Sequence, residues 1–164
     1  MKKLIACVLA LVCILSLSAC DSAKQKQVVV FSFCGENELF AISNGVILLG
    51  DAEEVFHGGD LEIIRTELFA DVVSCSTTFY TITNGERRAI LSNSVVGVTG
   101  SSANVNRDLG RISGDKGLTG IGIENIEDLK SNLWFELNTT DVNGNTSTYQ
   151  LQLKPTEITS GTAE

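Results

Sequence analysis

The chain has 164 residues, of which 43% are hydrophobic, and its 20 acidic side chains outnumber its 12 lysines and arginines to give a net charge of −8. This length suits one domain that buries an adequate core without metals or many crosslinks. An acidic chain lacks the positive footprint of a nucleic-acid binder, and anionic lipid headgroups repel it. We therefore expect no nucleic-acid partner.

The first residues carry the most specific signal in the sequence. Met1-Lys2-Lys3 is a short positive start, and an apolar run of about 14 residues follows from Leu4 to Leu17. The run has the length of a signal-peptide core and is shorter than the roughly 20 residues that span a bilayer as a helix. The alternatives are an ordinary secretory signal, cut within a small-residue site around Ala19, and an uncleaved membrane helix.

The segment Leu17-Ser18-Ala19-Cys20 resembles the lipobox of bacterial lipoproteins. The resemblance implies that small residues at Ser18 and Ala19 fit the signal peptidase, and that the Cys20 thiol accepts a diacylglyceryl group before cleavage. Residues 1–19 are then a lipoprotein signal peptide. Acylated Cys20 then anchors the chain in membrane lipid on the extracytoplasmic face, since each buried methylene adds about 0.8 kcal/mol.

Two cysteines lie beyond the predicted anchor. Cys34 and Cys75 enclose a segment of about 40 residues. Outside the cytoplasm such a pair can form a disulfide, and closing a loop of that length stabilises a fold by roughly 2–4 kcal/mol. The alternative is two unconnected buried thiols. Neither cysteine belongs to a C-x-x-C motif, so we expect neither a redox site nor a metal site at them.

Runs of β-branched and aromatic residues predict strands after a lipidated cysteine and polar tether at residues 20–27. The predicted strands are 28–33, 39–42, 46–49, 61–64, 72–83, 87–91, 95–98, 133–137 and 149–153. Asn44-Gly45, Asn84-Gly85 and Asn143-Gly144 each predict a hairpin turn, because both residue types tolerate positive φ. His57-Gly58-Gly59-Asp60 predicts a tight turn before the strand at 61–64.

Helical signals are short. Residues 66–71 predict one helical turn with Leu68 and Phe69 facing inward, and 125–132 predict a short helix capped by its first asparagine. The segment 97–122 is rich in glycine, serine and asparagine, and it predicts the longest surface loops.

Together these elements predict an all-β fold. Short strands, hairpin turns, one proline and no long helix favour an antiparallel β-sandwich, immunoglobulin-like in the loose sense, with one or two short helical turns. The sandwich domain covers 28–155, and 156–164 predicts a flexible polar tail. Trp134 lies within an apolar run, so we assign it to the core rather than to a ligand-stacking role.

Three patterns that resemble catalytic or metal sites lack the rest of their motifs. His57 lies near Asp60, but no G-x-S-x-G supplies a nucleophile elbow. The S-x-x-K at Ser113 lies in a glycine-rich loop rather than at a helix start. The segment from Asp141 to Asn145 starts like a calcium loop, but its glycine is fourth and Gln152 occupies the twelfth place. We predict no catalytic residue, metal or cofactor.

The function predicted from sequence is therefore coarse. The domain loosely resembles small lipoproteins of Gram-positive gut bacteria through Gly35-Glu36-Asn37-Glu38, and this resemblance implies no activity. We predict a membrane-anchored, non-catalytic binding or structural module at the cell envelope. The alternative is an accessory subunit of a membrane sensor, transporter or envelope assembly, with an envelope protein as its partner.

Overall fold

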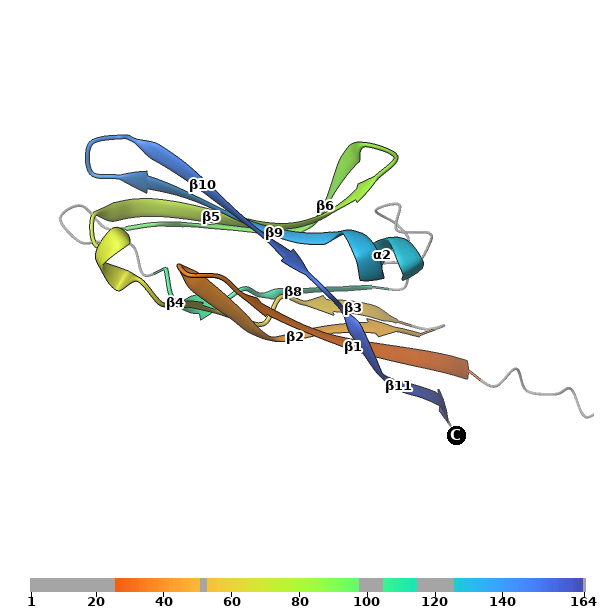
Figure 1. The fold of residues 1–164 in the computed structure, drawn as a ribbon. Coiled ribbons are helices and arrows are strands. Elements are labelled where there is room, and N and C mark those ends of the chain that lie inside the picture. Colours follow the sequence, from red (N-terminus) through yellow and green to blue (C-terminus); the bar gives the residue numbers. More distant parts are fainter. Residues whose placement is uncertain (1–25, 51–52, 98–104, 115–125, 164) are drawn as a thin grey trace, which may run out of the picture.

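The computed structural model describes residues 26–50, 53–97, 105–114 and 126–163, which form two antiparallel β-sheets packed face to face (Figure 1). The predicted β-sandwich is confirmed. Sheet A contains seven strands: β1 (Lys26–Glu36), β2 (Phe40–Leu49), β3 (Glu54–His57), β4 (Asp60–Ile63), β7 (Arg107–Asp108), β8 (Arg111–Gly114) and β11 (Thr156–Ala163). Its order is β11-β1-β2-β3-β8, with β4 paired to β2 and β7 paired to β4.

Sheet B lies above sheet A in Figure 1. Its four strands, in the order β10-β9-β5-β6, are β10 (Thr146–Leu153), β9 (Leu133–Asp141), β5 (Val72–Thr83) and β6 (Glu86–Val96). A 3-10 turn, η1 (Thr66–Leu68), precedes β5, and the helix α2 (Ile126–Asn132) leads into β9. Neither of these described helices is long and apolar enough to cross a membrane.

Phenylalanine rings fill the space between the sheets. Strand alternation sends every second side chain inward, so both sheets contribute to one core. Rings stack or meet edge-to-face with centroids 5.1–5.8 Å apart in the pairs Phe33–Phe56, Phe33–Phe79, Phe56–Phe79, Phe79–Phe135 and Phe40–Phe135. Each fully buried ring contributes about 1.5–3 kcal/mol, so this cluster is the main hydrophobic link between the sheets.

The predicted hairpin at Asn44-Gly45 is wrong. Asn44 has the expected positive φ of 58°, but β2 runs through it, and the register with β1 shifts there as at a β-bulge. Gly45 leaves room for the ring of Phe33, because a Cβ on Gly45 would lie 2.2 Å from that ring. The positive φ therefore bends a continuous strand instead of reversing the chain.

The bend in β2 lets it pair with two successive strands on the same side. Its first half pairs with β4 and its second half with β3, both antiparallel. The predicted tight turn at His57–Asp60 is accordingly a kink between β3 and β4. Gly59 has a φ of 77°, and a Cβ there would lie 2.0 Å from the Ser43 carbonyl oxygen, so only glycine fits.

The other two Asn-Gly predictions are confirmed. Asn84 and Gly85, with φ of 53° and 81°, form the turn between β5 and β6. Gly144, with φ of 83°, lies in the turn between β9 and β10, where its N–H donates to the Asp141 carbonyl oxygen at 3.0 Å.

The helical and loop predictions are mixed. The turn at η1 forms and Phe69 is buried, but Leu68 is 55% exposed, so its predicted inward position is wrong. Within the predicted loop segment 97–122, residues 105–114 contain the short strands β7 and β8. Residues 98–104 and 115–125 lie outside the described part of the chain.

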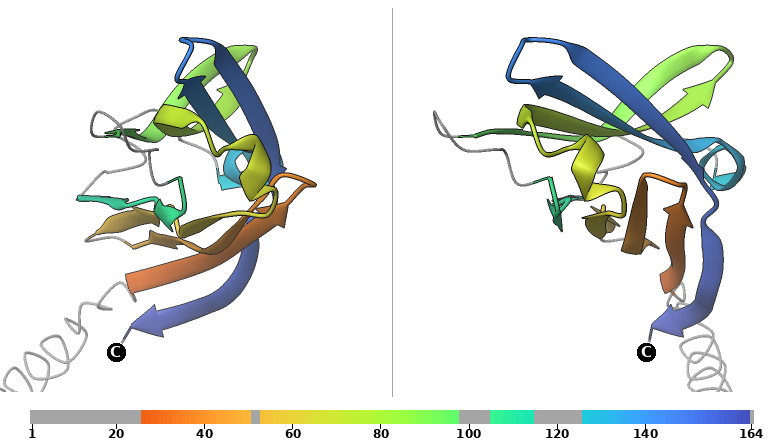
Figure 2. Two further views of the ribbon diagram at one scale, coloured as in Figure 1. Left: turned by 90° about the vertical axis from the view of Figure 1, so that its left-hand side faces the viewer. Right: turned by 60° about the vertical axis from the view of Figure 1, so that its left-hand side comes forward.

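The predicted flexible tail after Pro155 is also wrong. Residues 156–163 form β11, which pairs antiparallel with β1 from Lys26 onward. The two strands form a ribbon that extends beyond sheet B, with the C-terminus at its end (Figures 1 and 2). The domain therefore begins two residues earlier than the predicted boundary at Val28, and it continues past 155.

Candidate binding face on sheet B

The cysteines are not brought together. Cys34 follows the buried Phe33 on β1, so its thiol is exposed on the outer side of sheet A, whereas Cys75 is buried on β5 in sheet B. A disulfide needs Cβ atoms about 3.5–4.5 Å apart, which side chains on opposite sides of a sheet layer cannot reach. Both thiols are free, which agrees with the alternative of two unconnected thiols rather than with the disulfide, although Cys34 is exposed and not buried. Cys20, the predicted lipidation site, lies outside the described residues.

Cys75 has the environment of a structural thiol. Burial raises its pKa, and the nearby Arg107 guanidinium offsets this only in part. The thiolate is the reactive form of cysteine, so a buried neutral thiol is a poor nucleophile.

The side chains of two of the three rejected motifs serve turns, whereas Ser113 lies on strand β8, opposite Val55 of β3, and not in the expected loop. His57 Nδ1 accepts the Gly59 N–H at 3.0 Å, and Asp60 Oδ2 accepts the Asn44 side-chain N–H at 2.9 Å, which fixes the kink between β3 and β4. The Asp141 carboxylate accepts N–H groups of Asn143 and Asn145 at 2.8 Å. The described residues contain no group of three or more side chains that could hold a metal ion.

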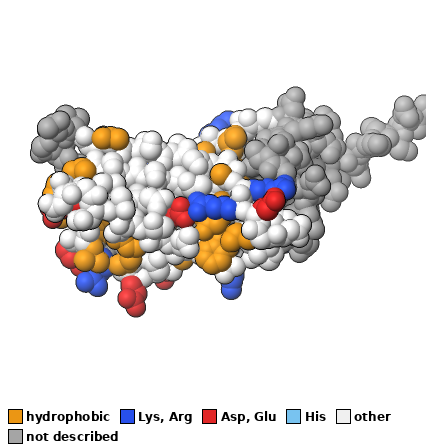
Figure 3. All heavy atoms as spheres, turned by 90° about the horizontal axis from the view of Figure 1, so that it is seen from above, with side chains coloured by type: hydrophobic (Ala, Val, Ile, Leu, Met, Phe, Trp, Pro, Cys, Tyr) orange, Lys and Arg blue, Asp and Glu red, His pale blue; other side chains and the backbone are white. Residues whose placement is uncertain are grey.

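The outward side of sheet B is the most organised polar surface among the described residues. Cross-strand register places its outward side chains in four rows, which we name the polar face. From β6 to β10 the rows are Val96-Ser74-Thr140-Thr146, Ser94-Ser76-Asn138-Thr148, Ser92-Thr78-Glu136-Gln150 and Ala89-Tyr80-Trp134-Gln152, with Arg87 beyond Ala89. No described element covers it, and Figure 3 looks onto this side of the molecule.

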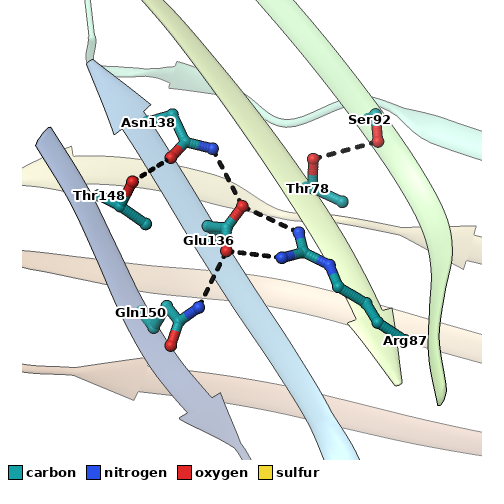
Figure 4. Close-up of polar contacts among 7 residues, drawn as sticks. All are labelled: Thr78, Arg87, Ser92, Glu136, Asn138, Thr148 and Gln150. Atoms are coloured by element: carbon teal, nitrogen blue, oxygen red, sulfur yellow. Dashed lines mark hydrogen bonds and ion pairs between the residues drawn. The ribbon is translucent and has the colours of Figure 1, made fainter. Parts of the chain in front are cut away.

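Glu136 is the centre of a hydrogen-bond network on the polar face (Figure 4). Arg87 donates to both of its carboxylate oxygens, at 2.7 and 2.9 Å. Gln150 and Asn138 donate side-chain N–H groups to it at 2.9 and 3.0 Å, and the Thr148 hydroxyl donates to Asn138 at 2.6 Å. Bidentate pairing of this kind fixes geometry as well as adding energy.

This network keeps Glu136 ionised. Its side chain is only 10% exposed, yet the hydrogen bonds from Arg87, helped by those from Gln150 and Asn138, outweigh burial and lower its pKa to about 2. A general acid needs a pKa near the working pH, so this carboxylate is poorly suited to proton transfer. Its role is to hold the groups around it.

Aromatic side chains continue the polar face next to this network. The Arg87 guanidinium lies 3.8 Å from the centroid of Tyr80, which is 2% exposed, and burial raises the pKa of the Tyr80 hydroxyl. Trp134 is the cross-strand neighbour of Tyr80 and is partly exposed on the same side. The assignment of Trp134 to the core is therefore wrong. Glu136 lies two residues further along the same strand, so its side chain faces the same side as Trp134. An ionisable residue favours the outward side, and this could have placed Trp134 there from the sequence.

An open depression of about 160 Å³ lies at the other end of the polar face. Cys75 and Val95 contribute to its lining, and the other lining residues belong to the outward rows: Ser74, Ser76, Ser94, Asn138, Thr140 and Val96. Hydroxyls donate and accept hydrogen bonds, and an amide does both at two atoms. The Glu136 network lies between the depression and Trp134, so the polar face can offer polar contacts and a partly exposed indole to one ligand.

Comparison with known proteins gives no match for this chain in protein families, among curated proteins or among solved structures.

Proposed function

We propose that this chain is a lipid-anchored, non-catalytic module that binds a ligand or partner at the outer side of a cell membrane. The anchor rests on the lipobox-like segment that ends at Cys20. The binding role rests on one observation, the polar face of sheet B, which is exposed, ordered by the Glu136 network and bordered by Trp134.

The placement of the anchor supports an accessible polar face. Lys26, the first residue of β1, follows Cys20 by six residues, a span of at most about 20 Å. Lys26, the described residue nearest to Cys20 in the sequence, begins the β1–β11 ribbon, which extends beyond sheet B (Figure 2). The polar face lies on the other sheet.

Binding is favoured over catalysis by the chemistry of the polar face. Its one carboxylate is locked in an ion pair at a pKa of about 2, and its tyrosine hydroxyl has a raised pKa. Neither group exchanges protons readily near neutral pH. A fixed surface whose two charges form one ion pair, with a partly exposed indole beside it, is better suited to recognition.

The anchor is tested by detergent phase partitioning of membranes that contain the full chain. The wild type is expected in the detergent phase and Cys20→Ala in the aqueous phase, because the acyl chains supply the membrane affinity. Cys34→Ser, which removes an exposed thiol from the folded domain, is the matched control and is expected to partition like the wild type. Cys20→Ala in the detergent phase would contradict the anchor.

The binding role is tested by crosslinking in the native host with a tag after Glu164. Captured material is identified by mass spectrometry and glycan analysis for the wild type and for Ser94→Lys, which places a long charged side chain at the exposed rim of the depression. Loss of capture in this variant is expected. Identical capture by both proteins, or none by either, would refute the polar face as the binding surface.

A further inference from the structure

We infer that the polar face binds a neutral oligosaccharide, held between the indole of Trp134 and the depression beside Asn138. This inference rests on the binding role proposed above and names the class of ligand.

The charge of the polar face disfavours strongly charged ligands. Among the outward side chains of its four rows and Arg87, the charged ones are Arg87 and Glu136, which neutralise each other in a bidentate pair. The whole chain carries −8, so an anionic ligand meets a repulsive field and no unpaired cation in the rows. A cationic ligand would have to compete with Arg87 for the carboxylate. A neutral ligand fits this balance.

The hydrogen-bonding groups match hydroxyl-rich ligands. The depression is rimmed by three serine hydroxyls, a threonine hydroxyl and the amide of Asn138. The amides are held in place: Asn138 bonds Glu136 and Thr148, and Gln150 bonds Glu136 while its carbonyl oxygen points away from the network (Figure 4). Fixed donors and acceptors reduce the ordering cost on binding.

The indole of Trp134 supplies the apolar half of such a site. A pyranose ring presents C–H groups on its faces and hydroxyls around its edge, so it stacks on an aromatic ring while the hydroxyls bond polar neighbours. Trp134 is partly exposed beside Tyr80, and Gln152 faces it from β10. From Ser76 to Tyr80 the strand advances by about 13 Å, which is longer than one sugar ring and favours an oligosaccharide.

The experiment titrates the full chain, in a detergent without sugar headgroups, with cellotetraose, xylotetraose and the tetramer of N-acetylglucosamine. A heparin tetrasaccharide serves as the anionic control. Trp134 is the single tryptophan of the chain, so its fluorescence reports on the proposed site directly, and calorimetry measures the affinity of every variant. A saturable change with at least one neutral tetrasaccharide is expected, and none with heparin.

Two variants and two controls locate the binding. Trp134→Ala and Ser94→Lys are each expected to weaken the affinity at least about tenfold, one from each end of the polar face. Ser113→Lys makes the same change at an exposed serine on β8 in sheet A, and Leu68→Ala truncates an exposed side chain on η1; both are expected to bind like the wild type. Circular dichroism checks the fold, and Ser94→Lys carries the test if Trp134→Ala unfolds.

Three outcomes would overturn the inference. They are no response to any neutral tetrasaccharide, undiminished binding in both polar-face variants, and a preference for heparin. If no tetrasaccharide binds but crosslinking captures a protein with the wild type and not with Ser94→Lys, the binding role stands and the oligosaccharide is wrong. If crosslinking is also unaffected by Ser94→Lys, the binding role itself fails.

Discussion

Protonation of Glu136 should destabilise the fold in acid, and Glu136→Gln should remove that pH dependence. The pKa of this carboxyl is about 2 in the folded chain against an ordinary 4.5, chiefly because Arg87 donates two hydrogen bonds to it. Since the folded pKa is lowered, its stabilisation is fully present above about pH 5.5 and is lost as the pH falls toward about 2. The window lies between the two pKa values.

The magnitude follows from the same pKa difference. At 1.36 kcal/mol for each pKa unit, the difference corresponds to about 3.4 kcal/mol. The Arg87 side chain is 43% exposed, so water screens its contribution, and we expect about 2 kcal/mol to be lost. Glu136→Gln should therefore lower the free energy of unfolding by about 2 kcal/mol near pH 6.5 and by much less near pH 2.

Urea unfolding of both proteins at these two pH values measures the effect. Other carboxyls titrate in the same range, so the informative quantity is the difference between wild type and variant at each pH. Glu67→Gln is the control: this carboxylate pairs with Arg65 on the exposed turn η1, and no measurable change is expected. Parallel pH dependence of wild type and Glu136→Gln would refute the role assigned to the network.

Two further predictions concern the glycine at the bend and the two thiols. Gly45→Ala should lower the free energy of unfolding by about 1–3 kcal/mol, because its Cβ would meet the Phe33 ring at 2.2 Å; thermal melting of the variant and the wild type measures the loss. Cys34 should react with iodoacetamide in the folded protein, whereas Cys75 should react only after unfolding, as read by peptide mass spectrometry. Equal rates at the two thiols would contradict their opposite placement.

The strands and the positions of the Asn-Gly dipeptides could be predicted from the sequence. Whether each Asn-Gly reverses the chain or bends a strand could not. The same Asn-Gly dipeptide reverses the chain at Asn84 and Asn143, yet bends a continuous strand at Asn44. Both outcomes need a residue that accepts positive φ, so local chemistry does not separate them. What distinguishes the bend is tertiary: the ring of Phe33 on β1 and the backbone at Gly59, between β3 and β4, approach it closely.

The polar face could not be predicted from the sequence, because its residues come from strands far apart in the chain. Arg87 and Glu136 are 49 residues apart and meet only because β6 and β9 both flank β5. Trp134 was obscured by its apolar neighbours Leu133 and Phe135, which face the core while the indole faces outward. Strict alternation counted from Glu136 would have placed it on the polar side. No local pattern predicts which residues of β5, β6 and β10 lie beside it, because these depend on the order and register of the strands.

The Glu136 network contributes more to geometry than to net stability. Desolvating a carboxylate and a guanidinium offsets much of their attraction, and well-packed apolar residues often stabilise a fold equally well in such places. Apolar residues would not fix the orientation of the neighbouring polar side chains. Through Glu136 the network holds Arg87 over Tyr80 and orients Asn138 and Gln150 in the rows of the polar face. That rigid arrangement, with Trp134 beside it, is what a surface built to recognise a neutral ligand requires.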